Sequence, residues 1–143
     1  MTSGMIRAVL FDPDKGEMEW REVEDSWQSF KEYIGDWTEG HMAVFGGRPT
    51  VLYCDEMGTV KGLTPSVVSG SGRILVRGRI VLTMPDGHGN DLGITPGHYG
   101  RLNMCRRSAR HGGRDVAVLV CDSEPAVGTG AENIGRAAEE VDG

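Results

Sequence analysis

The sequence predicts an α+β fold, a single globular domain with an antiparallel or mixed sheet and one or two helices. Runs with strand-like length and composition outnumber helical patterns, and the longest of them covers residues 73–84. One clear amphipathic helical pattern lies between Trp27 and Ile34. The 143-residue chain is long enough for one domain with a core and too short for two ordinary ones.

The first half of the chain predicts a hairpin, a helix and a second hairpin. Residues 5–11 and 17–23 have strand patterns on either side of an Asp-Pro-Asp-Lys-Gly turn. Asp25 or Ser26 can cap a helix that ends at Gly35, which we expect to have positive φ. The apolar stripe of this helix consists of Trp27, Phe30, Tyr33 and Ile34. Residues 37–45 and 49–54 predict the second hairpin, and a turn with positive φ at Gly58 follows it.

The second half predicts one long strand, one helix and one buried strand. Gly78 lies in the middle of the 73–84 run and indicates a bulge or bend. Residues 86–91 fit a hairpin loop, although their two carboxylates and glycines also suit a cation or phosphate. Thr95 and Pro96 are typical of a helix start, and we expect this helix to continue to about Arg110 despite two internal glycines. A final strand covers residues 115–121.

The net charge of −6 is unevenly distributed. Residues 122–143 have six acidic residues against Arg136 alone, which gives this segment −5 and leaves −1 for residues 1–121. The composition of 122–143 predicts a disordered acidic tail after a globular domain of residues 1–121. The charge distribution argues against nucleic acid as a partner, because the body offers no general electrostatic attraction and the tail opposes it.

The sequence shows neither a targeting signal nor a metal-binding motif. No signal-peptide pattern or bilayer-length apolar run is present, so we expect a cytoplasmic protein with no membrane partner. Cys54, Cys105 and Cys121 form no Cys-x-x-Cys pair, which favours reduced thiols. Cys54 and Cys121 each follow an apolar run and fit strand-end core positions. We expect no metal site and no cofactor, because short-spaced ligand pairs are missing.

The clearest local charge anomaly is the stretch from Pro96 to Arg114, which has five arginines and no acidic residue. Arginine binds phosphate oxygens in pairs through its planar guanidinium group. The candidate anion-binding residues of this stretch are His98, Arg101, Arg106, Arg107 and Arg110. On the predicted helix, Arg106 and Arg110 would share one face. The alternatives are a solvated basic face and a face that tethers the acidic tail.

Aromatic residues near the first helix complete the candidate site. Tyr33 and Trp37 could stack on a base if Trp37 is exposed. The alternative is that Trp20, Trp27 and Trp37 are core and hairpin anchors. No nucleophile, base and orienting group are indicated together, so no catalytic residue is assigned and we expect a protein that is not an enzyme.

Three short segments resemble a known family. Residues 33–39 (Tyr-Ile-Gly-Asp-Trp-Thr-Glu), the β-like run 49–54 and the turn 55–58 (Asp-Glu-Met-Gly) occur in that order. This order resembles an uncharacterised domain of unknown function from small phage, plasmid and Gram-positive bacterial proteins. The resemblance covers about residues 6–95 and implies no activity.

The resemblance and the arginines together suggest two functions. The first is a phage- or plasmid-type counter-defence protein that sequesters an anionic small molecule, such as a nucleotide immune signal, in a pocket completed between subunits of a homo-oligomer. The second is a protein-interaction module that inhibits a host enzyme or nucleic-acid-binding protein. In either case the protein would act in the bacterial host cytoplasm. This step rests on analogy.

Overall fold

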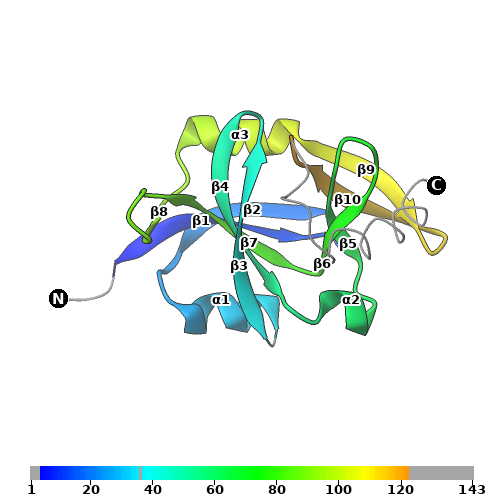
Figure 1. The fold of residues 1–143 in the computed structure, drawn as a ribbon, viewed down its shortest axis with the longest axis horizontal. Helices are drawn as coiled ribbons and strands as arrows, with labels where there is room; N and C mark the ends of the chain where they lie inside the picture. The colour runs from blue at the N-terminus through cyan, green and yellow to red at the C-terminus, as the bar shows by residue number, and fades with distance from the viewer. Residues whose placement is uncertain (1–3, 36, 123–143) are drawn as a thin grey trace.

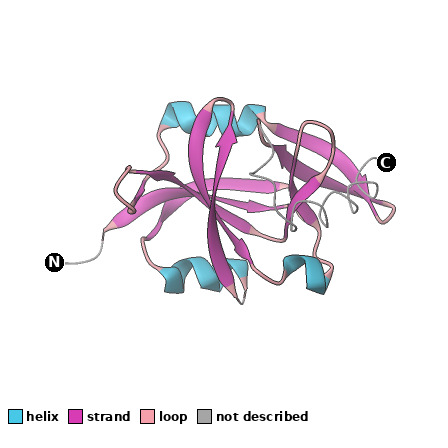
Figure 2. Ribbon diagram, in the orientation of Figure 1, coloured by secondary structure: helices cyan, strands magenta, loops and turns pink. Residues whose placement is uncertain are grey.

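The computed structural model describes residues 4–35 and 37–122. Strands dominate this part of the chain, with three short helices (Figures 1 and 2). The described elements are β1 (Met5–Asp12), β2 (Glu17–Glu24), α1 (Trp27–Ile34), β3 (Thr38–Phe45), β4 (Arg48–Asp55), α2 (Gly58–Lys61), β5 (Pro65–Val68), β6 (Ile74–Arg77), β7 (Ile80–Pro85), β8 (Asp91–Leu92), α3 (Pro96–Met104), β9 (Arg106–His111) and β10 (Arg114–Val120). The α+β class is therefore as predicted.

The larger sheet is antiparallel, with the strand order β2-β1-β7-β4-β3, and β8 pairs with β7. Both predicted hairpins are confirmed. β1 and β2 pair continuously from Met5 opposite Glu24 to Asp12 opposite Glu17. β3 and β4 pair from Thr38 opposite Asp55 to the turn. The predicted 86–91 loop joins β7 to β8, where Asp86 accepts hydrogen bonds from backbone amides inside the loop.

The smaller sheet is mixed, with the order β6-β5-β10-β9 and a parallel β5–β10 pair. The predicted single strand 73–84 is divided between the two sheets, because β6 belongs to this sheet and β7 to the larger one. Gly78 makes the division. Its φ is 96°, and a Cβ there would lie 2.9 Å from Leu63 Cδ1. The predicted bend is thus a change of sheet.

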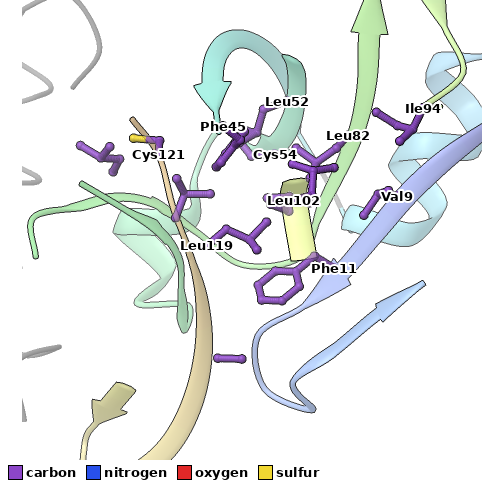
Figure 3. Packing of buried hydrophobic residues seen from close by; sticks show 14 residues of the cluster. Val9, Phe11, Phe45, Leu52, Cys54, Leu82, Ile94, Leu102, Leu119 and Cys121 are labelled. Carbon is purple, nitrogen blue, oxygen red and sulfur yellow. The ribbon is translucent and has the colours of Figure 1, made fainter. Parts of the chain in front are cut away.

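Each face of the larger sheet is covered by a different layer (Figure 1). Helix α1 covers one face, where alternate residues of β1 such as Ala8 and Leu10 pack with Phe30. Helix α3 and the smaller sheet cover the other face. The main core there joins Val9, Phe11 and other residues of the larger sheet to Leu102 and Leu119 (Figure 3). Consecutive residues of β1 therefore pack on opposite faces of the sheet, as the two-residue period of a strand requires.

Both predicted caps of helix α1 are confirmed. Ser26 Oγ accepts a hydrogen bond from Ser29 N at 3.1 Å, and Gly35 ends the helix with φ 130°. Phe30 and Ile34 are buried as expected. Trp27 begins the apolar stripe but is 57% exposed.

The expected helix from Pro96 to about Arg110 is wrong in its second half. Helix α3 ends at Met104, and Cys105 N donates to Arg101 O and Leu102 O in its last turn. The next residues form β9, which pairs antiparallel with β10 along its length. β10 has a strong apolar strand pattern and needs a second partner besides β5. Residues 106–111 supply that partner as an edge strand.

The expected positive φ at Gly58 is also wrong. Gly58 begins α2, and the left-handed glycine is Gly62, with φ 68°, at the end of that helix. Gly58 is needed for a different reason. A Cβ at this position would lie 2.7 Å from the backbone oxygen of Arg77, so only glycine allows α2 to approach β6 this closely.

The predicted acidic tail lies outside the described residues apart from Asp122. The Asp122 carboxylate accepts hydrogen bonds from Gly46 N at 2.8 Å and Gly47 N at 2.5 Å, so it binds the β3–β4 turn. Of the helices described, none combines the length and apolar character needed to cross a membrane.

Candidate functional site

The arginines of the acid-free stretch point to different parts of the molecule. Arg101 on α3 donates from Nη1 to Gly46 O at 2.7 Å, and Arg106 on β9 donates from Nη2 to Gly16 O at 2.7 Å. Both arginines therefore hold hairpin turns of the larger sheet. Because residues 106–110 form a strand, the predicted shared helical face of Arg106 and Arg110 does not exist.

Arg107 and Arg110 border an open groove of about 640 Å³ on the smaller sheet. Loop 69–72, which joins β5 to β6, forms the opposite rim. The groove is lined by Val68, Ser69, Gly70, Ser71, Gly72, Arg107, Ser108, Ala109, Arg110, Val118 and Val120. Valines at the floor belong to a small apolar cluster with Ile74. The groove thus combines an apolar floor with a cationic rim.

The arginine rim retains hydrogen-bonding capacity. Arg107 uses Nη1 for Met104 O at 2.6 Å and Arg106 O at 2.8 Å, and a guanidinium group has five N–H donors in total. Arg110 pairs with Asp115 Oδ1 at 3.1 Å, but the two side chains are 55% and 84% exposed. An ion pair this exposed contributes little to stability. Arg110 Nη2 also donates to Gly113 O at 2.9 Å, so part of this guanidinium group is engaged by the β9–β10 turn.

The loop rim adds backbone donors. Gly72 N donates to Ser69 O at 3.0 Å, which closes a tight turn with φ 91° at Gly72. The Ser69 and Ser71 hydroxyl oxygens lie 2.9 Å apart. Within residues 4–35 and 37–122, the amides of Gly70 and Ser71 have no hydrogen-bond acceptor. Successive free amides in glycine-rich turns are typical of anion-binding loops.

The groove offers binding groups and no proton-transfer groups. Among the described residues, its lining has no carboxylate, imidazole or thiol, which are common general acids, bases and nucleophiles. The hydroxyls of its described lining come from Ser69, Ser71 and Ser108. The described lining therefore places two guanidinium groups and three hydroxyls beside apolar surface.

His98 does not reach this groove. It is fully buried in α3, with Nε2 2.9 Å from Thr50 Oγ1. Thr50 Oγ1 donates to Arg48 O at 3.0 Å, so His98 Nε2 must be the donor in its contact with Thr50. Burial, and then the charge of Arg48, lower the pKa of His98. His98 is therefore a neutral core residue.

Tyr33 and Trp37 lie in a different region, by α1 and the start of β3. Trp37 is 64% exposed, and with Trp27 and Lys31 it borders a hollow of about 170 Å³. Tyr33 is half-buried, and burial, followed by the charge of Asp12, raises its pKa to about 12. The guanidinium carbon of Arg79 lies 5.7 Å from the Tyr33 ring centroid.

The expected role of the tryptophans as anchors holds for Trp20. Its ring stacks on Tyr99 at 5.1 Å, and its Nε1 donates to Ile94 O at 3.0 Å. Trp27 contacts Tyr53 edge-on at 5.1 Å but leaves most of its surface exposed. The Trp27–Trp37 pair is therefore a surface feature.

One cluster of possible metal ligands was missed by the sequence reasoning. Glu39, His41 and Cys54 bring one ligand atom each within 4.8 Å of one another. Burial, and then the carboxylate of Glu39, raise the pKa of Cys54 to about 12. The available sequence signal was the Glu-x-His alternation on one strand. Pairing of β3 with β4 adds a cysteine that lies fifteen positions from Glu39.

Comparison with known proteins identifies a family for most of the chain. A family model described as a domain of unknown function, DUF3846, matches residues 6–103. The chain belongs to the DUF3846 family. This finding confirms the resemblance seen over about residues 6–95. No curated protein and no solved structure matches the chain.

The DUF3846 match ends one residue before the last residue of α3. It includes loop 69–72 and the Trp27–Trp37 pair, whereas β9 and β10 follow it. The groove therefore joins a loop of the DUF3846 region to a hairpin beyond that region.

Proposed function

We propose that the protein binds an anionic small molecule of the nucleotide class in the groove between loop 69–72 and β9. The observation that carries the proposal is that Arg107 and Arg110 line one groove together with Val68, Val118 and Val120. The guanidinium groups and the free amides of the loop suit phosphate oxygens, and the valines suit a base or sugar face. The described lining has no carboxylate, imidazole or thiol, which favours sequestration over reaction.

The size and donors of the groove agree with tight binding. A volume of about 640 Å³ is within the range of small-molecule pockets, about 300–1,000 Å³. Sequestration at nanomolar affinity needs about −12 kcal/mol. Hydrogen bonds to charged groups contribute about 1.5–3 kcal/mol each before ordering costs, so two arginines and two amides supply a large part.

A second copy of the chain would complete this site. β9 is an outer strand of the smaller sheet, and among the described strands one of its edges has no partner and could pair with another copy. Closing the open groove with another copy would exclude water from the bound anion and strengthen its ion pairs. The proposal therefore includes a homo-oligomer with the ligand at its interface.

The biological setting that we propose rests on analogy with small phage and plasmid proteins. A nucleotide immune signal of a bacterial host is an anion with apolar rings, which is the ligand chemistry that this groove suits. Holding such a signal would lower its free concentration, and the protein would act as a counter-defence factor in the host cytoplasm.

A second candidate function is supported by the exposed tryptophan pair. Trp27 and Trp37 are 57% and 64% exposed and border one hollow. Tryptophan is enriched at the energetic centres of protein interfaces. This surface would suit a protein-interaction module that inhibits a host enzyme or nucleic-acid-binding protein.

Titration calorimetry against linear and cyclic nucleotides tests the first candidate. We expect binding to weaken at least a hundredfold, about 2.7 kcal/mol, when Arg107→Gln and Arg110→Gln are combined. The control combines Arg101→Gln and Arg106→Gln, which removes the same charge outside the groove, and should bind like the parent. An equal loss of nucleotide affinity in both double variants, or no binding by the parent, would refute the groove as the binding site and favour the tryptophan surface.

A further inference from the structure

Strand pairing at the edge of the larger sheet gathers three different metal-ligating side chains. Glu39 and His41 are two residues apart on β3, so they extend from the same face of the strand. Cys54 is directly opposite Glu39 on β4. The carboxylate oxygen, imidazole nitrogen and thiol sulfur all lie within 4.8 Å of one another. β3 is the outer strand of the sheet, so this cluster is at the sheet edge.

The three side chains are already positioned as a set. His41 Nε2 is 3.0 Å from Glu39 Oε2. Cys54 is only 4% exposed, and in the described part of the chain its thiol has no hydrogen-bond partner although it faces the other two ligand atoms. The Glu39 and His41 side chains are 39% and 52% exposed, which leaves an entry path for an ion. The cluster thus has a buried anchor and two accessible arms.

The neighbouring carboxylate of Asp55 is already engaged elsewhere. Asp55 accepts hydrogen bonds from Lys61 Nζ at 2.7 Å and Met57 N at 2.8 Å, which occupies its two oxygens. Among the described residues, the cluster offers three ligand atoms, one each from Glu39, His41 and Cys54.

The donor types select a class of metal. Thiolate, imidazole and carboxylate together suit zinc and related divalent transition metals, whereas calcium and magnesium prefer oxygen ligands alone. Zinc bonds of about 2.0–2.3 Å in tetrahedral array place neighbouring ligand atoms roughly 3.3–3.7 Å apart. The observed separations approach that arrangement after small side-chain movements. Three protein ligands leave one position open.

We propose that Glu39, His41 and Cys54 bind a divalent transition-metal ion of the zinc class, with one coordination position open to an external ligand. The proposal is independent of the anion groove, because none of the three residues lines it. It also departs from the sequence-based expectation, in which no metal site was foreseen.

Titration of the full chain with Co²⁺ tests this site directly. A thiolate bound to Co²⁺ gives a charge-transfer absorption in the near ultraviolet, and tetrahedral Co²⁺ gives visible bands. We expect both to saturate at one equivalent and to disappear when Zn²⁺ is added. Cys54→Ser should abolish the charge-transfer band, and His41→Ala should weaken Co²⁺ binding at least about a hundredfold.

Matched controls separate this site from adventitious binding. Cys105→Ser removes a thiol outside the cluster, and His88→Ala removes an exposed imidazole outside it, so both variants should bind Co²⁺ like the parent. If Cys54→Ser fails to fold, His41→Ala and Glu39→Gln still test metal binding by the cluster, because both substitutions change accessible side chains. No charge-transfer band in the parent, or full-affinity binding in His41→Ala, would overturn the proposal.

Discussion

Replacing Gly58 with Ala tests the packing of α2 against β6. The new Cβ would lie 2.7 Å from Arg77 O, closer than a carbon and a carbonyl oxygen can approach. That oxygen cannot easily move away. Arg77 is 7% exposed and pairs with Pro65, its Nη1 donates to Leu63 O at 2.9 Å, and the amide of the next residue is hydrogen-bonded to Thr64 O at 2.7 Å.

The expected magnitude follows from two opposing effects. Overpacking costs about 1–3 kcal/mol. Removing a glycine stabilises by about 0.4–1 kcal/mol, because the unfolded chain loses conformational freedom. The net loss for Gly58→Ala should be about 1–2 kcal/mol, which lowers the melting temperature by roughly 3–8 °C for a domain of this size.

Gly100 provides a matched control. It lies within α3 without positive φ, and a Cβ there would meet nothing within 4 Å. Gly100→Ala should therefore stabilise the protein by about 0.5–1 kcal/mol. Thermal unfolding followed by circular dichroism compares the two variants with the parent. If Gly58→Ala melts at or above the parent temperature, the close approach of α2 to β6 is wrong.

Two further changes probe the core and the β3–β4 turn. The pKa of His98 is lower in the folded state, so the unfolded state takes up a proton at higher pH. The free energy of unfolding should therefore decrease as the pH falls below about 6.5. Denaturant unfolding at pH 7 and pH 5 should show a smaller decrease for His98→Gln than for the parent, and an equal decrease would contradict the buried neutral histidine. Asp122→Ala should lower the free energy of unfolding by about 1 kcal/mol, because it removes the acceptor of two turn amides, and Asp122→Asn should lower it by about half as much. Urea unfolding measures both, and midpoints that match the parent would show that this carboxylate does not stabilise the turn.

The hairpins and α1 could be predicted because their signals are local. Capping by Ser26, the glycine with positive φ at Gly35 and the apolar spacing of Phe30 and Ile34 all lie within one turn or one helix. The turn glycines of the β3–β4 hairpin likewise lie next to each other. Such features depend on short-range geometry, which the sequence specifies directly.

The end of α3 could not be predicted because its signal is ambiguous. Arg106 and Arg110 are four residues apart, and that spacing places two side chains on one face of either a helix or a strand. β9 also has no apolar alternation, since it is a polar edge strand. Its strand conformation depends on pairing with β10.

The remaining differences arise from contacts between distant residues. The requirement for Gly58 comes from Arg77 O, nineteen positions later, and the break at Gly78 comes from the division between two sheets. The cluster of Glu39, His41 and Cys54 depends on the register of β3 and β4. Residue spacing gives only partial signals here, the Glu-x-His alternation on β3 and the glycine at position 78, and neither shows which distant residue is in contact.

The most direct test of the anion groove is an NMR titration of the ¹⁵N-labelled full chain with a cyclic dinucleotide. The proposal predicts saturable shifts of the backbone amides of Gly70, Ser71 and Gly72 together with those of residues 107–110. The indole signals of Trp27 and Trp37 should not move. Shifts centred on those indoles, or no shifts at ligand concentrations of about 1 mM, would contradict the groove as the binding site.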